Sequence, residues 1–527
     1  MITVEYRCSD GTPFPVTFES DADADRPWAL EREHNRPPLS PLADALERLG
    51  TSGRERAYGE AGLPVPGFFR TGPLARGFPY YCTAPPTDEE MGALFGGCAA
   101  LIADHGSAEG IWRGYALPRI RAVCETLQAA GPDDELAPLA DAQVYGQHLT
   151  MIPAFVTGND MRLLAAVCGE VRPDQGDIVA NELAQGYPSE TLRADQALWD
   201  LGRQVRESPS LAGALRGSDP APVLAGMRAR DEETAFFGAL DAFLDEFGWR
   251  SELWQIDVPT WRELGPGFLA QLRQMARDDA KRPDDAVRAA AVRRVSVAAE
   301  IDGLLAGDDD RRSRFHRRVA RVAPYVAVRE ERAHWQLALV GSLRHAVLRH
   351  GGALASRGAI ERAEDVLYLL PEEVEGTTGD LSGVVAERRA SHDALTRLDP
   401  PLVLQAPDGE HPDAAAPGEG SVHGVGASRG RVTGRARVIT QLADADRVEP
   451  GDVLVCVTTS PPWTPLFGLI GAVVVDSGDM GSHPAIAARE YGIPCVLGTA
   501  TGTTMIPDGA LVTVDGDTGT VVVLPGA

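Results

Sequence analysis

Apolar residues change their spacing along the chain, and the first change marks a large helical region. From Met91 to Leu398 they recur every three to four positions, as in MGALFGGCAALIADHG and FFGALDAFLDEFGW, which is the period of amphipathic helices. The preceding residues, 1–90, mix short strand-like runs such as ITVEYR with Pro-rich loops. We therefore expect a helical domain over 91–398, with an irregular N-terminal segment packed on it.

The second change separates the helical region from a small domain of different composition. Residues 399–421 are rich in Pro and Gly and lack apolar periodicity, which predicts a semi-rigid linker. Short β-branched runs punctuated by glycine follow, among them DVLVCVTT, GAVVVDSG and LVTVDGD. They predict a compact α/β domain over 422–527. A small domain on a long linker is the layout of a part that moves.

Charge and composition narrow the classes of partner. The chain has 527 residues, 44% of them hydrophobic, and a net charge of −26 from 50 basic and 76 acidic residues, which is typical of a multidomain acidic globular protein. Nucleic acid and anionic membranes would be repelled overall, so we expect neither as a partner. Lys281 is the only lysine, which excludes a P-loop lysine and disfavours Schiff-base chemistry.

The sequence shows neither a targeting segment nor a metal-binding motif. The N-terminus has no basic region followed by an apolar run, and no stretch reaches the length of a membrane span, so we expect a cytoplasmic protein. The seven cysteines are scattered without a CxxC pair, and His, Cys and Asp do not cluster. We expect reduced thiols and no metal bound by this chain.

The segment from Gly471 to Gly498 carries the most specific chemistry. A buried strand, AVVVDS, runs into a glycine-rich turn, and a helix then begins near Pro484. This order places His483 at a helix N-terminus, where free N–H groups and the helix dipole favour an anion such as a phosphoryl group. Ser482 is expected to cap the helix or orient the ring. On local physics alone, a capping or packing role for His483 stays open.

The run GSHPAIAAREYGIPCVLG resembles the phosphohistidine signature of the swivelling mobile domain in phosphoenolpyruvate-utilising enzymes. GVGASRGRVTGRARV and GDVLVCVTTSPPWTPLF extend this resemblance over 422–527. It implies that His483 is the phosphorylated residue. Asp479 and Met480 occupy a turn where relatives more often have a second glycine, so the local turn geometry is expected to differ.

The helical region resembles, more weakly, the acceptor-binding domain of rifampicin phosphotransferases. The fragments that carry the resemblance include WALEREHNRPPLSPL, LAQGYPSETLRADQALWDL and FGWRSELWQIDVPTW. Neither an ATP-grasp domain nor a phosphoenolpyruvate barrel is evident. The combination implies a subunit of a split enzyme, similar to the phenylphosphate synthase type, whose separate ATP-grasp partner binds ATP and Mg²⁺.

The resemblance implies that phosphate passes from ATP through His483 to the hydroxyl of a small organic acceptor, with aromatic hydroxyl compounds among the candidates. Two alternatives stay open. A ligase similar to the prodigiosin-type condensing enzymes would use phosphate to activate one substrate for coupling to another. A non-catalytic phosphocarrier would only pass the phosphate on.

Further site residues are predicted on the fragments that match the family. We expect Arg250 and Arg329 to bind phosphoryl oxygens and Glu252 and Glu330 to act as acid or base, with plain ion pairs as the alternative. The acceptor pocket is expected to draw on His148, His34, Trp249, Trp254 and Tyr187, although core packing is the commoner role of such residues. Trp249 also replaces a more usual histidine, so the acceptor's identity does not carry over.

Overall fold

The structure is a computed structural model. It describes residues 1–65, 72–73, 75–83, 87–173, 175–217, 220–277, 282–376, 379–404 and 420–524, without the side chains of 157–159. Most of the predicted linker, at 405–419, and Lys281 lie outside these residues. The chain divides into two compact units. Unit 1 comprises Met1–Val156, Leu253–Val258 and Trp335–Asp413, and unit 2 comprises Thr157–Glu252, Pro259–His334 and Ala414–Ala527.

Unit 1 combines two small sheets with helices, so the N-terminal segment is more regular than predicted. Its first sheet is the antiparallel pair β1–β2, and its second has the order β4-β3-β5. Phe14, Phe18 and Trp28 are buried in the core beneath these strands. The strands are β1 (Ile2–Arg7), β2 (Pro13–Phe18), β3 (Trp28–Leu30), β4 (Tyr80–Cys82) and β5 (Val403–Leu404).

The helices of unit 1 include two that continue into unit 2. These are α7 (Leu136–Gly169) and α16 (Val322–Ser356), and the division between the units falls inside both of them. The other helical segments are α1 (Asp21–Ala24), α2 (Pro41–Leu49), α3 (Thr51–Glu60), α4 (Asp88–His105), α5 (Ala108–Ile111), the π-helix Trp112–Ala116, α6 (Leu117–Ala129), the 3-10 helix Ala363–Tyr368, α17 (Pro371–Gly376) and α18 (Ser382–Leu395).

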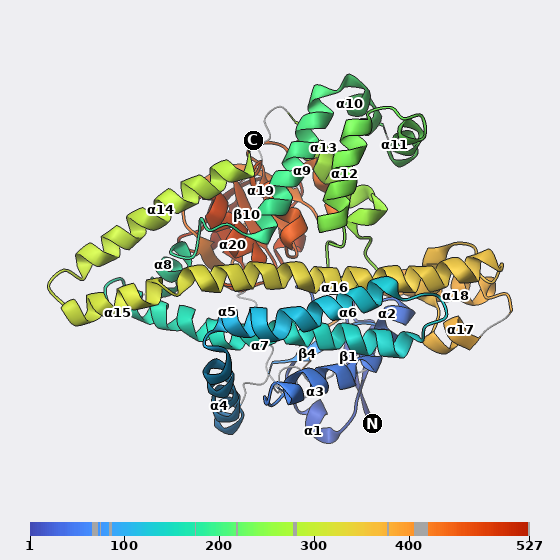
Figure 1. Cartoon of the computed structure of the whole chain (residues 1–527), viewed down its shortest axis with the longest axis horizontal. Coiled ribbons are helices and arrows are strands. Elements are labelled where there is room, and N and C mark those ends of the chain that lie inside the picture. Colours follow the sequence, from blue (N-terminus) through green and yellow to red (C-terminus); the bar gives the residue numbers. More distant parts are fainter. Residues whose placement is uncertain are drawn as a thin grey trace. The chain divides into compact units, whose positions relative to one another are not determined.

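The helical part of unit 2 is built around three neighbouring helices, α9, α12 and α13 (Figure 1). Apolar residues on one face of each helix, such as Leu198, Phe243 and Leu272, form a common core. The helices in sequence order are α8 (Gly176–Glu182), α9 (Glu190–Glu207), α10 (Pro209–Leu215), α11 (Pro220–Ala229), α12 (Thr234–Phe247), the 3-10 helix Trp261–Glu263, α13 (Pro266–Met275), α14 (Pro283–Leu304) and α15 (Asp309–Val319).

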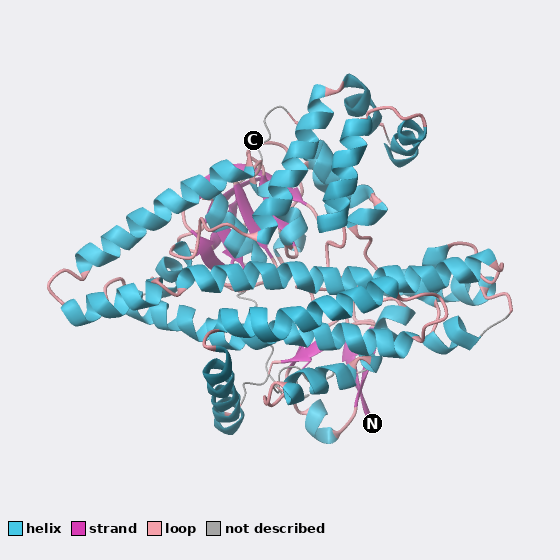
Figure 2. Ribbon diagram, in the orientation of Figure 1, coloured by secondary structure: helices cyan, strands magenta, loops and turns pink. Residues whose placement is uncertain are grey.

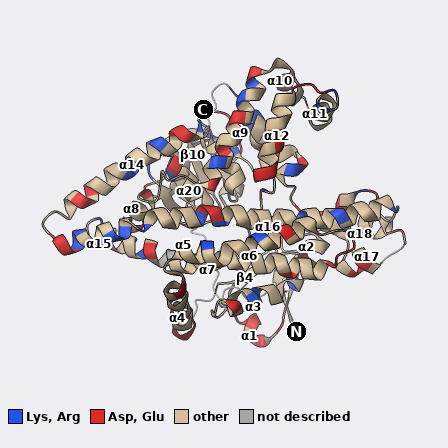
Figure 3. Cartoon of the chain, viewed as in Figure 1, with Lys and Arg blue, Asp and Glu red and all other residues tan. Residues whose placement is uncertain are grey.

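Helix α15 holds much of the arginine-rich stretch of the sequence. Figure 3 colours these basic positions blue on the ribbon of α15. Arg312 pairs with Asp302 at 2.6 Å, and Arg314 pairs with Glu170 at 3.3 Å. Both pairs are accessible to solvent, with the arginine side chains nearly half exposed, so they contribute little to stability.

The rest of unit 2 is an α/β domain around an eight-stranded sheet of order β6-β13-β12-β8-β9-β10-β11-β7 (Figure 2). Strands β8 to β11 pair in parallel, and the other pairings are antiparallel. Adjacent residues of β9 enter different cores, with Leu454 on one face and Val455 on the other. Because both faces of the sheet are buried, its central strands are uninterrupted apolar runs in the sequence. The predicted fold class, a multidomain chain with a large helical region and a C-terminal α/β domain, is confirmed.

The elements of this domain follow one another at short intervals. They are β6 (Ser421–His423), β7 (Val425–Ser428), β8 (Arg431–Val438), the 3-10 helix η5 (Leu442–Arg447), β9 (Val453–Cys456), the 3-10 helix Pro461–Trp463, α19 (Thr464–Phe467), β10 (Ala472–Val475), α20 (His483–Tyr491), β11 (Cys495–Leu497), α21 (Gly502–Met505), β12 (Leu511–Asp515) and β13 (Thr520–Val523). The predicted domain boundaries at 90, 398 and 421 stay predictions.

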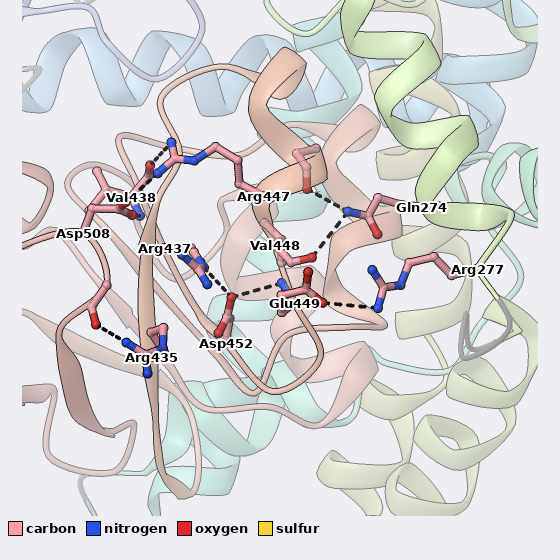
Figure 4. A network of polar contacts seen from close by, with 12 residues as sticks. Gln274, Arg277, Arg435, Arg437, Val438, Arg447, Val448, Glu449, Asp452 and Asp508 are labelled. Carbon is pink, nitrogen blue, oxygen red and sulfur yellow. Dashed lines mark hydrogen bonds and ion pairs between the residues drawn. The ribbon is translucent and has the colours of Figure 1, made fainter. Parts of the chain in front are cut away.

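Helix α13 packs on the segment η5 of the α/β domain. The buried Gln274 donates from Nε2 to the carbonyls of Ala445 at 2.8 Å and Val448 at 3.4 Å (Figure 4). Arg273 pairs with Asp446, and Arg277 lies 3.3 Å from Glu449. These polar contacts hold the α/β domain against the helices within unit 2.

Replacing Gln274 with leucine tests this contact, because it leaves two carbonyl groups of η5 without their donor. We expect hydrogen exchange of the η5 amides to rise about tenfold, which corresponds to about 1.4 kcal/mol of lost local stability. The strands β9 and β10 should be unaffected. Gln271→Leu is the matched control, since among the described residues the buried Gln271 donates only to the Gly267 carbonyl of its own helix. Equal exchange in both variants would contradict the assigned role of Gln274.

Candidate functional site

His483 is the first residue of α20, which follows a tight turn after β10. Gly478 has φ 116°, and a Cβ there would lie 2.7 Å from Ser482 Oγ, so the turn requires glycine. Gly492 ends the helix with φ 67°. The strand–turn–helix order predicted from the sequence is thus observed, and His483 sits beside the free N–H groups of the helix start.

The neighbouring residues of the turn stabilise its backbone. Ser482 is the N-cap, but its hydroxyl donates to the Asp479 carbonyl at 2.7 Å and makes no capping bond to the helix. The Asp479 carboxylate accepts from the Gly481 N–H at 2.7 Å, and the Met480 carbonyl accepts from Arg489 at 2.9 Å. The predicted capping by Ser482 is therefore wrong, because the same hydroxyl bonds to the turn instead.

Two threonine hydroxyls contact the two nitrogens of the His483 ring. Thr459 Oγ1 lies 2.8 Å from Nδ1, and Thr464 Oγ1 lies 3.0 Å from Nε2. Thr464 also donates to the Pro461 carbonyl at 2.7 Å, so it is left to accept at Nε2. This pattern assigns the proton of the neutral ring to Nε2 and leaves the Nδ1 lone pair facing the hydroxyl of Thr459.

Burial and positive charge keep this ring neutral. Desolvation, followed by the charges of Arg329 and Arg250, lowers the pKa of His483 from 6.5 to about 3. A neutral imidazole is the nucleophilic form of histidine. The same two arginines would attract an anionic phosphoryl group once it is attached to the ring.

Arg329 lies on α16 and is mostly buried. Its guanidinium pairs with Glu330 at 2.9 Å and lies 5.4 Å from the centre of the Tyr325 ring. Arg329 and Glu330 thus form an ion pair, which was the alternative to a catalytic role for these two residues.

Arg250 is 1% exposed and lies between α9 and α16 residues. Its Nη2 donates to the Glu190 carbonyl at 3.1 Å and lies 3.4 Å from His334 Nδ1. Within the described part of the chain, its Nε and Nη1 have no hydrogen-bond partner. Burial lowers the pKa of Arg250 to about 10, so the side chain remains a cation at neutral pH.

Glu252 contacts the α/β domain through both its side chain and its backbone. Its Oε1 accepts from the Leu442 N–H at 2.9 Å, and its carbonyl accepts from Ser460 Oγ at 2.5 Å. These contacts place Glu252 in the attachment of the α/β domain. Its expected role as acid or base stays a prediction.

Two acidic residues beside the site were missed by sequence reasoning. Asp195 on α9 is fully buried, and burial raises its pKa well above the ordinary value. The Glu490 carboxylate on α20 accepts from the Gly186 N–H at 3.0 Å, and burial raises its pKa to about 7. An acidic residue on the apolar face of a helix, as in LRADQALWDL, was the available signal for Asp195.

The residues proposed for the acceptor pocket are divided between the units. His34, His148 and Trp254 belong to unit 1, where the rings of His34 and Trp254 stack with centres 3.9 Å apart. In unit 2, Arg294 covers the ring of Tyr187 at 3.7 Å, and Arg262 covers that of Trp249 at 4.5 Å. Of these five residues, His34 and Trp254 thus contact each other, whereas Tyr187 and Trp249 contact different arginines.

Acid should destabilise the fold through its neutral histidines. The pKa is lowered by burial to about 3 for His483 and His334 and to about 4 for His148. Between these values and 6.5 the unfolded chain binds more protons than the folded chain. Stability should thus be complete above about pH 6.5 and fall below it, by up to about 1.4 kcal/mol per pH unit for each histidine.

Urea unfolding across this pH range measures the effect. His483→Gln should reduce the pH dependence of the unfolding free energy in acid by the equivalent of up to one bound proton. His423→Gln, at an exposed position of the same domain, should leave this pH dependence unchanged. An unaltered slope for His483→Gln would contradict a buried neutral ring.

The described residues hold no group of three His, Cys, Asp or Glu side chains placed to bind a metal ion. Nor do they form a helix long and apolar enough to cross a membrane.

Comparison with known proteins agrees with the resemblances seen in the sequence. Residues 448–519 match the family described as "PEP-utilising enzyme, mobile domain". Residues 150–330 match "Rifampicin phosphotransferase fourth domain". The first match contains His483 with Thr459 and Thr464, and the second contains Asp195, Arg250 and Arg329. The resemblance to phosphoenolpyruvate-utilising enzymes and rifampicin phosphotransferases is confirmed.

Three curated relatives extend these matches over more of the chain. A chondramide synthase of Chondromyces crocatus is 29% identical over 97% of this chain and 14% of its own length. An uncharacterised phosphotransferase of Bacillus subtilis is 28% identical, with coverages of 72% and 47%. A rifampicin phosphotransferase of Streptomyces sviceus is 31% identical, with coverages of 62% and 39%. The chain thus spans less than half the length of each relative.

Proposed function

We propose that this chain is the subunit of a phosphotransferase in which His483 carries a phosphoryl group from ATP to the hydroxyl of a small organic acceptor. The observation that carries this proposal is the neutral His483 ring at the start of α20, within the field of Arg329 and Arg250. Its relatives in Bacillus subtilis and Streptomyces sviceus are named as phosphotransferases, which supports the same reaction class.

The reaction has two steps. In the first, a separate ATP-grasp protein binds ATP with Mg²⁺, which neutralises the nucleotide phosphates, and a His483 nitrogen attacks a phosphorus atom of ATP. The P–N bond forms as the P–O bond to the rest of the nucleotide breaks, and the remainder of the nucleotide leaves with the electron pair of that bond. In the second, the acceptor oxygen attacks the phosphoryl group, the P–N bond breaks, and its electron pair returns to the imidazole. The helix N–H groups and the two arginines bind the phosphoryl oxygens during transfer.

Coupling of two substrates is the second candidate function. The match along nearly the whole chain to part of a chondramide synthase favours it, because that relative is named as a synthase. Here the phosphoryl group would activate one substrate, and inorganic phosphate would leave when the other attacks. Analysis of the products separates the two functions, since only a phosphotransferase yields a stable phosphate ester.

Separate labelling of the β- and γ-phosphates of ATP tests the proposal. The chain is incubated alone and then with candidate ATP-grasp proteins, and acid-labile label on His483 is scored. Label that appears from the β-phosphate, and only with a partner, supports a dikinase-type phosphotransferase in the split arrangement. Label on the chain alone contradicts that arrangement, and no label with any partner contradicts the role of His483.

A further inference from the structure

A buried carboxylate and a buried guanidinium near His483 both have open hydrogen-bonding positions. Asp195 is 0% exposed and Arg250 is 1% exposed. Among the described residues, neither oxygen of Asp195 has a hydrogen-bond partner, nor do Nε and Nη1 of Arg250. Buried polar groups are almost always satisfied in folded proteins, so two acceptors and two donors left open together indicate a place for a ligand group or water.

The two residues interact electrostatically without a direct contact. After burial, the charge of Arg250 is the largest influence on the pKa of Asp195. The unfilled hydrogen-bonding capacity is complementary to a hydroxyl group, which donates one hydrogen bond to a carboxylate and accepts others from a guanidinium. An anionic group held between these two residues would be repelled by the Asp195 carboxylate, so a neutral hydroxyl fits better there, while the charge of Arg250 still acts on the phosphoryl group at His483.

The same residues lie beside the phosphohistidine helix. Arg250 acts electrostatically on both Asp195 and His483. Asp195 in turn acts on Tyr491, the last residue of α20. Glu252, two residues after Arg250, accepts at its carbonyl from Ser460, and the adjacent Thr459 contacts His483 Nδ1. The segment that holds Arg250 is therefore joined by a hydrogen bond to the loop that contacts the His483 ring.

We infer that Asp195 and Arg250 bind the hydroxyl of a neutral acceptor and that Asp195 removes its proton during transfer, an inference that rests on the proposed function. The acceptor oxygen forms the new P–O bond, and the P–N bond to His483 breaks. The hydroxyl proton passes to Asp195, and the electron pair of the broken bond returns to the imidazole.

The environment of Asp195 suits this role. Burial raises the pKa of its carboxyl group, whereas the charge of Arg250 opposes this rise and favours the ionised form. A carboxylate whose pKa is raised is a stronger proton acceptor than an exposed one. The guanidinium of Arg250 remains available to hold the acceptor oxygen through its open N–H groups.

Asp195→Asn removes the base and preserves the shape of the side chain. The full chain is phosphorylated chemically with phosphoramidate, and loss of phosphohistidine is followed by ³¹P NMR in water alone and with added phenol. Water can also accept the phosphoryl group through its O–H. The hydrolysis rate therefore tests the role of Asp195 even if phenol is not a substrate. We expect the variant to be phosphorylated normally but to lose phosphate about 100-fold more slowly.

Asp200→Asn is the matched control, because Asp200 lies on the same helix with its side chain 49% exposed. It should decay like the natural chain. Equal decay of the Asp195→Asn variant would overturn the inference. If His483 accepts no phosphoryl group in any variant, the proposed function fails instead.

If His483 accepts no phosphoryl group, the stability of the Asp195→Asn variant still tests the role of Asp195. An unpartnered buried carboxylate kept for binding should weaken the fold, so Asp195→Asn should unfold at the same or higher urea concentration than the natural chain. A clear fall in the urea midpoint, without change at Asp200→Asn, would assign Asp195 a structural role and overturn the inference.

Discussion

His483→Ala is expected to reduce phosphoryl transfer by about 10⁴-fold or more, because it removes the atom that forms the covalent intermediate. The hydroxyls of Thr459 and Thr464 lie 2.8 and 3.0 Å from the two ring nitrogens, so the ring is held in one orientation. The measurement is transfer from labelled ATP in the presence of the partner, together with circular dichroism to show that the fold is kept.

His423→Ala is the control for this prediction. His423 is an exposed residue of β6 in the same domain, and its Nε2 lies 3.2 Å from Ser421 Oγ. Its removal should leave transfer unchanged. A His483→Ala variant that keeps a tenth of the activity would show that the phosphoryl group travels by another route.

Arg329→Gln is expected to lower transfer about 10²- to 10³-fold, because it removes a buried cation that attracts the phosphoryl group. The same change should raise the pKa of His483 above about 3 but leave it below 6.5, because burial, the largest cause of the lowered pKa, remains and only the charge of Arg329 is removed. An NMR titration of ¹³C-labelled histidine measures this shift independently of activity. Arg329→Lys should recover only part of the rate, because lysine lacks the planar fork of arginine.

The matched control is Arg321→Gln, at the residue that immediately precedes α16. Arg321 is exposed and pairs with Asp160 at 3.3 Å. Full activity is expected after its removal. A similar loss in both variants would mean that net charge, rather than the position of Arg329, determines the rate.

Features of the site that depend on neighbouring residues in the chain can be predicted from the sequence. The apolar strand, the glycine turn and Pro484 specify the start of α20 within one short segment, so the position of His483 at a helix start is predictable from that segment alone. The helical and α/β regions are likewise separable by the period of their apolar residues. In such segments the chain neighbours determine the conformation.

Contacts between distant segments cannot be derived in this way. Thr459 and Thr464 precede His483 in the chain, yet only folding brings their hydroxyls to its ring. The charge of Glu252 suggests a chemical role, whereas its carboxylate accepts from an amide that follows it by 190 residues. A polar side chain can form hydrogen bonds with many groups of the same chemical type. Only the tertiary structure determines which of these groups it contacts.

The measurement that tests the account most directly is ³¹P NMR of the chain after phosphorylation by phosphoramidate, with peptide mapping of the modified residue. We expect one dominant phosphohistidine signal, located at His483, which is absent from His483→Ala and present in His423→Ala. A signal that persists in His483→Ala, or a phosphoryl group mapped to another residue, would contradict the claim that His483 is the carrier.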